Sequence, residues 1–212
     1  MSRRTWPLAC RYAVPALAAG ALLVRSGRRV GWPLVGLAAG VMAFFRDPAR
    51  PLPREPGVAY AASDGFVAAV DHHVEEPWLP EGRATRITVF LSLTDVHVNR
   101  SPLPGRVQRM ERLGAGFAPA LLRRAQDNHR NRLLLEGPGE PVVLVQVAGA
   151  IARTISCWVR TGDELAAGQR VGLIHFGSRT DVLLPAGTAD VLVSPGDRVR
   201  AGVTRLARLK DR

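Results

Sequence analysis

Cysteine is scarce in this chain, which has two cysteines among 212 residues. Cys10 and Cys157 show neither CxxC spacing nor a paired framework, which excludes a disulfide scaffold and a thiolate metal site. We expect both thiols to be reduced, in a protein that faces the cytosol, and we predict no metal.

Acidic and aromatic residues are also few. Asp and Glu total 18 against 29 Lys and Arg, which gives a formal net charge of +11, and aromatic residues make up 6% of the chain. Such a charge calls for an anionic partner, either nucleic acid or an acidic membrane surface. The arginines are scattered and the aromatic residues do not alternate with them, so the stacking platform of a nucleic-acid-binding protein is missing. We therefore predict a membrane partner and no nucleic acid.

A long uninterrupted apolar run is absent as well. Residues 12–24 and 30–45 are uncharged and apolar, but each run is shorter than the roughly 20 residues that a helix needs to cross a bilayer. Arginines lie at both ends and in the turn between the runs. We predict a membrane-associating helical hairpin over residues 1–45, held peripherally or monotopically on the cytoplasmic face of the cell membrane. Two tight membrane spans, or two core helices of a soluble domain, are the alternatives.

The remainder of the chain reads as a linker and a β-rich domain. Residues 46–57 contain four prolines, a composition that forbids helix and suits an extended connector. Over residues 58–212 short β-rich runs alternate with turns, and residues 117–126 predict one short helix. The predicted strands are 65–70, 85–91, 105–112, 133–136, 142–148, 154–159, 171–176, 181–184 and 189–193. We predict a mainly β fold, a compact barrel or sandwich, because the strands follow too closely for helical crossovers.

A small internal repeat lies near the C-terminus. Residues 162–168 and 196–202 share the spacing Gly-Asp-x-x-x-x-Gly. These turns resemble the hairpins of biotinyl and lipoyl carrier domains, although no attachment lysine motif accompanies them. We predict lipoyl-carrier-like hairpins without a carrier role.

Three short segments contain the residue types of a catalytic site. They are the Gly177-Ser178 pair, the turn Ser63-Asp64-Gly65, and His97 between two valines. Taken singly, the first two are ordinary turn sequences and the third is an ordinary buried strand histidine. Taken together, they supply a nucleophile, an orienting carboxylate and a base.

Several ordered motifs carry a resemblance to a known family. They are FFRDP at 44–48, SDG at 63–65, FLSLTDVHVNR at 90–100, NHRN at 128–131, QVAG at 146–149, IAR at 151–153 and FGSR at 176–179. In these motifs the chain resembles the short-chain phosphatidylserine decarboxylases, which are pyruvoyl-dependent lipid enzymes. The resemblance spans residues 44–209.

The resemblance implies a reaction and a processing step. The proenzyme would cut itself between Gly177 and Ser178 into a β chain, 1–177, and an α chain, 178–212, which stay together as a heterodimer. Ser178 would become a covalent pyruvoyl group, the cofactor. A Schiff base between this group and phosphatidylserine would then lead to phosphatidylethanolamine.

The resemblance also implies roles for single residues. His97 would be the base that activates Ser178, Asp64 would orient the imidazole, and Arg100 would bind the phospholipid substrate. The donor that protonates the decarboxylated carbon stays open between His97 and a bound water. A pyruvoyl decarboxylase of another aminoacyl-type lipid is an alternative, as is a noncatalytic membrane-anchored β-barrel in which Gly177-Ser178 is only a turn.

Overall fold

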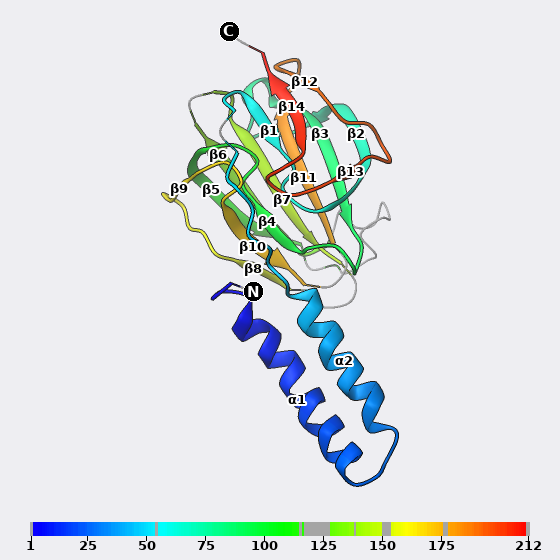
Figure 1. The fold of residues 1–212 in the computed structure, drawn as a ribbon. Helices are drawn as coiled ribbons and strands as arrows, with labels where there is room; N and C mark the ends of the chain where they lie inside the picture. Colours follow the sequence, from blue (N-terminus) through cyan, green and yellow to red (C-terminus); the bar gives the residue numbers. More distant parts are fainter. Residues whose placement is uncertain are drawn as a thin grey trace. The chain divides into compact units, whose positions relative to one another are not determined.

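The computed structural model describes residues 2–53, 55–114, 116, 128–137, 139–149, 154–175 and 178–210. The chain forms two compact units, Met1–Ala49 and Arg50–Arg212. The first is helical, and in the second the described regular elements are strands and one 3-10 turn (Figure 1).

The first unit is a pair of helices, α1 (Trp6–Arg25) and α2 (Gly31–Phe44), joined by a short turn. The helices approach most closely at Gly20 and Gly31, where a Cβ atom on either glycine would collide with the carbonyl group of the other. The predicted hairpin is present, and α1 begins earlier than the uncharged run because its first turns tolerate Arg11. By length and hydropathy α1 could cross a membrane, whereas α2 is shorter.

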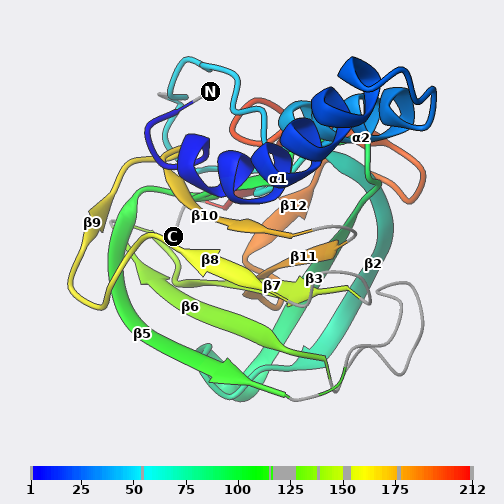
Figure 2. The ribbon, with the colours of Figure 1, turned by 90° about the horizontal axis from the view of Figure 1, so that it is seen from below.

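The second unit is organised around one eight-stranded antiparallel sheet that curls into an open barrel (Figure 2). Its order is β13–β2–β3–β11–β7–β6–β5–β9. The strands are β2 (Gly65–Glu75), β3 (Arg83–Leu91), β5 (Gly105–Leu113), β6 (Arg130–Glu136), β7 (Val142–Ala148), β9 (Glu164–Leu165), β11 (Ser178–Pro185) and β13 (Arg198–Val199).

Two three-stranded sheets and a 3-10 turn complete the unit. One sheet has the order β1–β14–β12 and the other β4–β10–β8. Their strands are β1 (Val58–Tyr60), β14 (Arg205–Leu209), β12 (Ala189–Val191), β4 (Val98–Arg100), β10 (Arg170–Ile174) and β8 (Ile155–Cys157), and the turn is η1 (Pro80–Gly82). The predicted mainly β fold is confirmed, and every predicted strand is present in whole or in part. The predicted helix at 117–126 lies outside the described residues.

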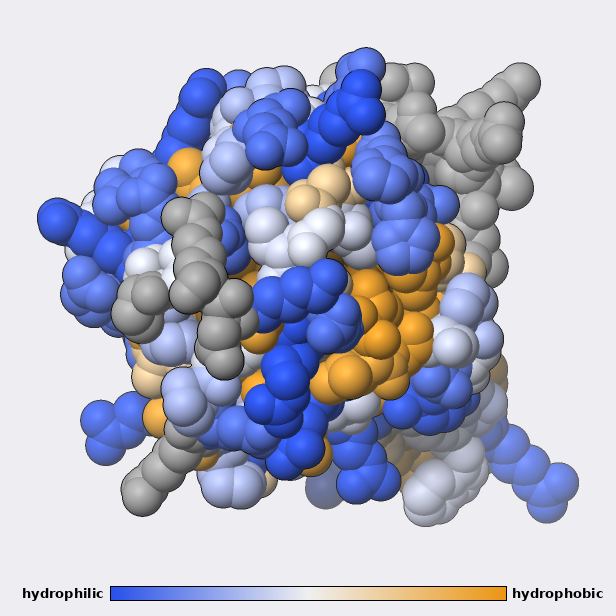
Figure 3. All heavy atoms as spheres, turned by 90° about the horizontal axis from the view of Figure 1, so that it is seen from above, coloured by the Kyte–Doolittle hydropathy of each residue, from blue (hydrophilic) through white to orange (hydrophobic). Residues whose placement is uncertain are grey.

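Strand β7 has an almost continuously apolar sequence because both of its faces are buried. Val142 and Leu144 pack into the main core inside the curled sheet, whereas Val143, Val145 and Val147 pack into a second cluster with Leu79. A strand that is buried on both faces needs apolar residues at successive positions. Gln146 is the exception, and it belongs to the candidate site. On the face shown in Figure 3, hydrophilic side chains surround an apolar area.

The internal repeat places its two strands at the two ends of the large sheet. The first repeat contains β9, which pairs with β5, and the second contains β13, which pairs with β2. All four repeat glycines have positive φ, and the backbones of Gly168 and Gly202 lie close to each other. The repeat is therefore a structural device that shapes both edges of the sheet.

Candidate active site

Ser178 is the first residue of β11, a central strand of the large sheet. It pairs with Leu91 of β3 on one side and with Ala148 of β7 on the other, and both of these residues are fully buried. Gly177, the predicted other half of the cleavage site, lies outside the described residues. The sequence pattern placed the start of this strand at residue 181, because Ser178 and Arg179 lack a β-forming side chain.

His97 lies just before β4 and is completely buried. Its carbonyl oxygen accepts a hydrogen bond from the N–H of Ile174, four residues before Ser178. Its ring nitrogen Nδ1 lies 3.0 Å from the carbonyl oxygen of Asp95. Since a carbonyl oxygen can only accept, Nδ1 carries the proton in this contact and Nε2 of the neutral ring is the acceptor. This is the tautomer that a general base requires.

Asp64 lies in the turn between β1 and β2, and two other segments hold its carboxylate. Arg50 donates to both of its oxygens, at 2.6 and 2.7 Å, and the N–H of Ala201 donates to Oδ1 at 2.8 Å. Arg50 also donates to the carbonyl oxygen of Ala201. Sequence reasoning missed Arg50 because it lies in the proline-rich linker. The orienting role of Asp64 stays a prediction, while the group that meets Nδ1 of His97 is the Asp95 carbonyl.

Short contacts tie the turn that contains Asp64 to the other two segments. The hydroxyl of Ser63 lies 2.6 Å from that of Thr180, and both residues are buried. The N–H of Arg100 donates to the carbonyl oxygen of Ala62. The neighbours of Asp64 thus bond to residues two positions after Ser178 and three positions after His97.

A chain of buried amide side chains fixes β4 against the large sheet. Asn131 donates to Gln146 at 2.9 Å, and Gln146 donates to Asn99 at 2.7 Å. These three residues are at most 1% exposed. Because a buried amide is costly unless it is paired, these side-chain hydrogen bonds favour one position of β4 against β7. His97, two residues before Asn99, is positioned by the same restraint.

Arg100, the predicted substrate ligand, is 3% exposed. Its guanidinium donates to the carbonyl oxygen of Gly168 at 2.9 Å. Its described contact therefore joins β4 to the first repeat, and substrate binding by Arg100 stays a prediction. Among the described residues, no group of three or more metal-ligating side chains is present.

The family model for phosphatidylserine decarboxylase matches residues 37–207 of this chain. The chain belongs to this family. The match covers the C-terminal part of α2 and nearly all of the β-rich unit, and it contains Asp64, His97 and Ser178.

Curated relatives named phosphatidylserine decarboxylase proenzyme resemble the chain over most of its length. The protein from Symbiobacterium thermophilum is 46% identical over 99% of this chain and 95% of its own. That from Erythrobacter litoralis is 42% identical over 85% and 77%, and that from Burkholderia ambifaria is 39% identical over 99% and 96%. The resemblance that the motifs carry is thereby confirmed.

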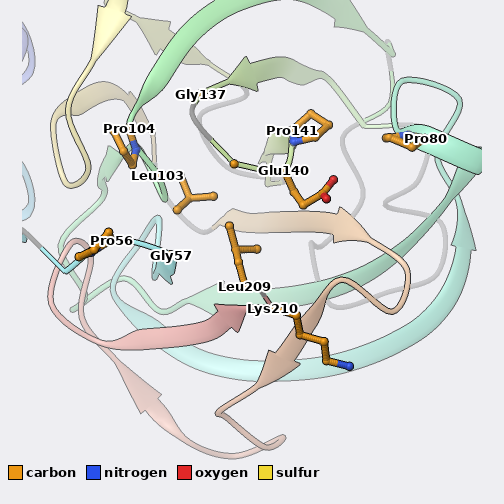
Figure 4. A pocket seen from close by; sticks show the side chains of 11 residues that line it. Pro56, Gly57, Pro80, Leu103, Pro104, Gly137, Glu140, Pro141, Leu209 and Lys210 are labelled. Carbon is orange, nitrogen blue, oxygen red and sulfur yellow. The ribbon is translucent and has the colours of Figure 1, made fainter. Parts of the chain in front are cut away.

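Figure 4 shows a cavity of about 500 Å³ in this decarboxylase-family chain, and its lining contains none of Asp64, His97 and Ser178. Leu103 and Leu209 face it, with Glu140 and Lys210 at its rim. It adjoins Pro141, just before the start of β7, whereas Ser178 pairs with Ala148 at the end of β7. A strand of this length spans roughly 20 Å, so this cavity does not adjoin the start of β11.

A smaller cleft of about 350 Å³ adjoins the candidate site directly. Its lining residues are Asp64, Asp95, Arg198, Val199, Arg200 and Thr204. The cleft is thus lined by Asp64, the predicted orienting acid, and by Asp95, whose carbonyl oxygen is hydrogen-bonded to Nδ1 of His97.

Proposed function

We propose that this chain is a self-processing, pyruvoyl-dependent decarboxylase that converts phosphatidylserine to phosphatidylethanolamine. Family membership supports the reaction. The observation that carries the proposal is the buried imidazole of His97, whose Nδ1 is hydrogen-bonded to a carbonyl oxygen. The backbone of His97 is also hydrogen-bonded to Ile174, four residues before Ser178.

In the processing step, Oγ of Ser178 attacks the carbonyl carbon of Gly177. The new C–O bond replaces the C–N bond, so the amide becomes an ester, while Nε2 of His97 accepts the hydroxyl proton and returns it to the departing nitrogen. Loss of the Cα proton of residue 178 to a base then expels Gly177 as a carboxylate and leaves a dehydroalanine at position 178. Hydrolysis of this group consumes one water, releases ammonia and leaves the pyruvoyl group.

The residues around position 178 fit such a group. The start of β11 is held between Leu91 and Ala148, which are fully buried, so a group formed there is fixed by two neighbouring strands. A pyruvoyl group supplies an electron sink for the pair released as carbon dioxide leaves. We propose that His97, the proposed base of the processing step, also supplies the proton that replaces the carboxylate.

The two chains produced by the cut stay together, in this proposal, because their strands are interleaved. The α chain contributes β11, which pairs with β3 and β7, and β14, which pairs with β1. It also contributes β13, which pairs with β2. Separating the chains would break the core, so we expect them to copurify and to separate only in denaturant.

We propose that the helical hairpin holds the enzyme on the cytoplasmic face of the membrane. Leu22 and Trp32 are 68% and 63% exposed, although both are large and apolar. Arg25 ends α1, and Arg28 and Arg29 lie in the turn that follows, where they can meet anionic headgroups. Flotation of the full chain with vesicles that contain anionic lipid tests this placement, and a chain that stays at the bottom of the gradient contradicts it.

Processing is tested by intact mass and denaturing electrophoresis. We expect two chains from the wild-type protein and one uncut chain from Ser178→Ala and from His97→Ala. His73→Ala, at an exposed histidine, is the matched control and should be cut normally. Cutting of His97→Ala at the wild-type rate would remove His97 from the role of base.

The substrate is tested separately, by release of labelled carbon dioxide from phosphatidylserine labelled in its carboxyl group. We expect release by the wild-type protein and none by Ser178→Ala. A protein that is cut but releases no label from phosphatidylserine would direct the search to another aminoacyl-type lipid. A protein that is never cut would favour the noncatalytic alternative.

A further inference from the structure

The smaller cleft presents two arginines from one short segment. Arg198 and Val199 form β13, in which Val199 is buried and pairs with Gly65. Arg198 and Arg200 flank this valine and both line the cleft. Because side chains alternate along an extended segment, burial of the middle residue sends its two neighbours to the same side.

The segment that carries these arginines is held firmly on both sides. Before it, the carboxylate of Asp197 accepts a hydrogen bond from the N–H of Ser194, and its carbonyl oxygen accepts one from Val67. After it, the N–H of Arg200 donates to the hydroxyl of Thr204 at 2.9 Å. The two guanidinium groups therefore start from a fixed backbone, which lowers the entropy cost of binding a ligand.

The charged side chains at the cleft have a positive sum, which favours the binding of an anion. Both oxygens of Asp64 already accept hydrogen bonds from Arg50. Asp95 pairs with Arg198 through Oδ1 at 3.1 Å, and its Oδ2 accepts two hydrogen bonds from Ser92. Arg200 is exposed, and among the described residues no carboxylate lies within ion-pair distance of it. The cleft thus has one more positive charge than its carboxylates balance.

The cleft also lies on the side of the sheet where the proposed chemistry occurs. Strand β13 is separated from β11 by β2 and β3, a distance of about 14 Å across the sheet. Asp95 connects the two places, since its side chain lines the cleft and its carbonyl oxygen meets Nδ1 of His97. When one end of a ligand contacts Arg198 and Arg200, its other end can therefore lie near His97.

We propose that Arg198 and Arg200 bind the phosphodiester of the lipid headgroup and so orient its serine moiety toward His97. Arginine suits this role because its planar fork of donors matches two phosphate oxygens. The phosphodiester competes with Asp95 for Arg198, an exchange that is inexpensive because the side chain of Arg198 is 69% exposed. This proposal rests on the proposed decarboxylase function and adds to it the site for the headgroup phosphate.

The test compares Arg198→Ala, Arg200→Ala and Arg200→Gln with the wild-type protein, using phosphatidylserine in neutral detergent micelles. A matched control is Arg106→Ala, which removes an exposed arginine from β5, near the other end of the sheet. We expect KM to rise about tenfold or more in each cleft variant, the effect of one lost charge-assisted hydrogen bond, with kcat nearly unchanged. Arg106→Ala should leave KM near the wild-type value.

Soluble probes separate a headgroup site from general attraction to anions. Glycerophosphoserine should inhibit the wild-type protein, and its inhibition constant should rise with KM in the cleft variants, whereas inorganic phosphate should inhibit more weakly. An unchanged KM in Arg200→Ala, or an equal rise in Arg106→Ala, would overturn the proposal. Equal inhibition of all variants by glycerophosphoserine would also overturn it.

Failure of the headgroup site gives a different result from failure of the decarboxylase function. If the wild-type chain is neither cut nor active, the proposed function fails. If the cleft variants are cut and release carbon dioxide with wild-type KM, only the headgroup site fails.

Discussion

Replacement of Asp95 by alanine tests whether the loop before His97 controls self-cleavage. The carboxylate of Asp95 accepts hydrogen bonds from the N–H and the hydroxyl of Ser92, at 2.8 and 2.6 Å, and its side chain is only 15% exposed. These bonds close the turn whose last carbonyl oxygen holds Nδ1 of His97. Without them, the carbonyl loses its fixed position and the imidazole can rotate or change tautomer.

The size of the effect follows from the lost contacts. A hydrogen bond to a charged group contributes about 1.5–3 kcal/mol. If one such contribution is lost in the transition state for the attack by Ser178, the rate of self-cleavage falls about tenfold to a hundredfold. Asp95→Asn keeps an acceptor for the N–H of Ser92 and should recover much of the rate. Arg198→Ala removes a partner of Asp95 but leaves the turn intact, so its cleavage should stay near the wild-type rate.

The assay is the time course of cleavage of freshly refolded proenzyme, followed by denaturing electrophoresis, with thermal unfolding of each variant measured in parallel. Loss of cleavage in Asp95→Ala at nearly unchanged Tm, with recovery in Asp95→Asn, would support a positioning role. Cleavage of Asp95→Ala at the wild-type rate would refute the reasoning, since the turn would then have no influence on His97.

Two further substitutions test the packing that supports the site. Gly65→Ala should destabilise the protein by about 1–3 kcal/mol from backbone strain alone, because Gly65 has a φ of +146°, and by more because the new Cβ would collide with the carbonyl group of Phe90. Gly187→Ala is the control and should destabilise less, since Gly187 also has a positive φ but open space around it. Equal losses of stability in the two variants on chemical denaturation would contradict the contact with Phe90. Leu144→Ala should lower the free energy of unfolding by about 2–5 kcal/mol, because it leaves a cavity in the main core. Leu192→Ala, at a 49% exposed position, should leave the free energy of unfolding nearly unchanged. Similar midpoints of unfolding for the two variants would argue against the assigned core.

Much of the fold followed from local sequence patterns. The strand runs are visible because a half-buried strand repeats every two residues, and because β7, buried on both faces, shows an apolar run. Some strands of two or three residues, among them β4, β9 and β13, were missed because so short a segment carries no periodicity. Strand β11 was predicted to begin too late, since its first residues, Ser178 and Arg179, are not the β-branched or aromatic types that mark a strand.

The candidate site was only partly visible in the sequence. Ser178, His97 and Asp64 were found because their residue types and motifs indicate a nucleophile, a base and a carboxylate. The partners of these residues were not found. Arg50 reads as part of a linker, and the function of Asp95 toward His97 belongs to its backbone carbonyl, a group that every residue possesses.

The sequence by itself determined the family, the mainly β class and the apolar hairpin, and it singled out the candidate reactive residues, since each depends on local composition or on ordered motifs. Only the tertiary structure decided that Arg50 neutralises Asp64, that the Asp95 carbonyl selects the tautomer of His97, and that Arg198 and Arg200 share a cleft with both carboxylates. These contacts join residues such as Asp95 and Arg198, which are far apart along the chain. Their closeness depends on the strand order and curl of the sheet, which no local pattern encodes.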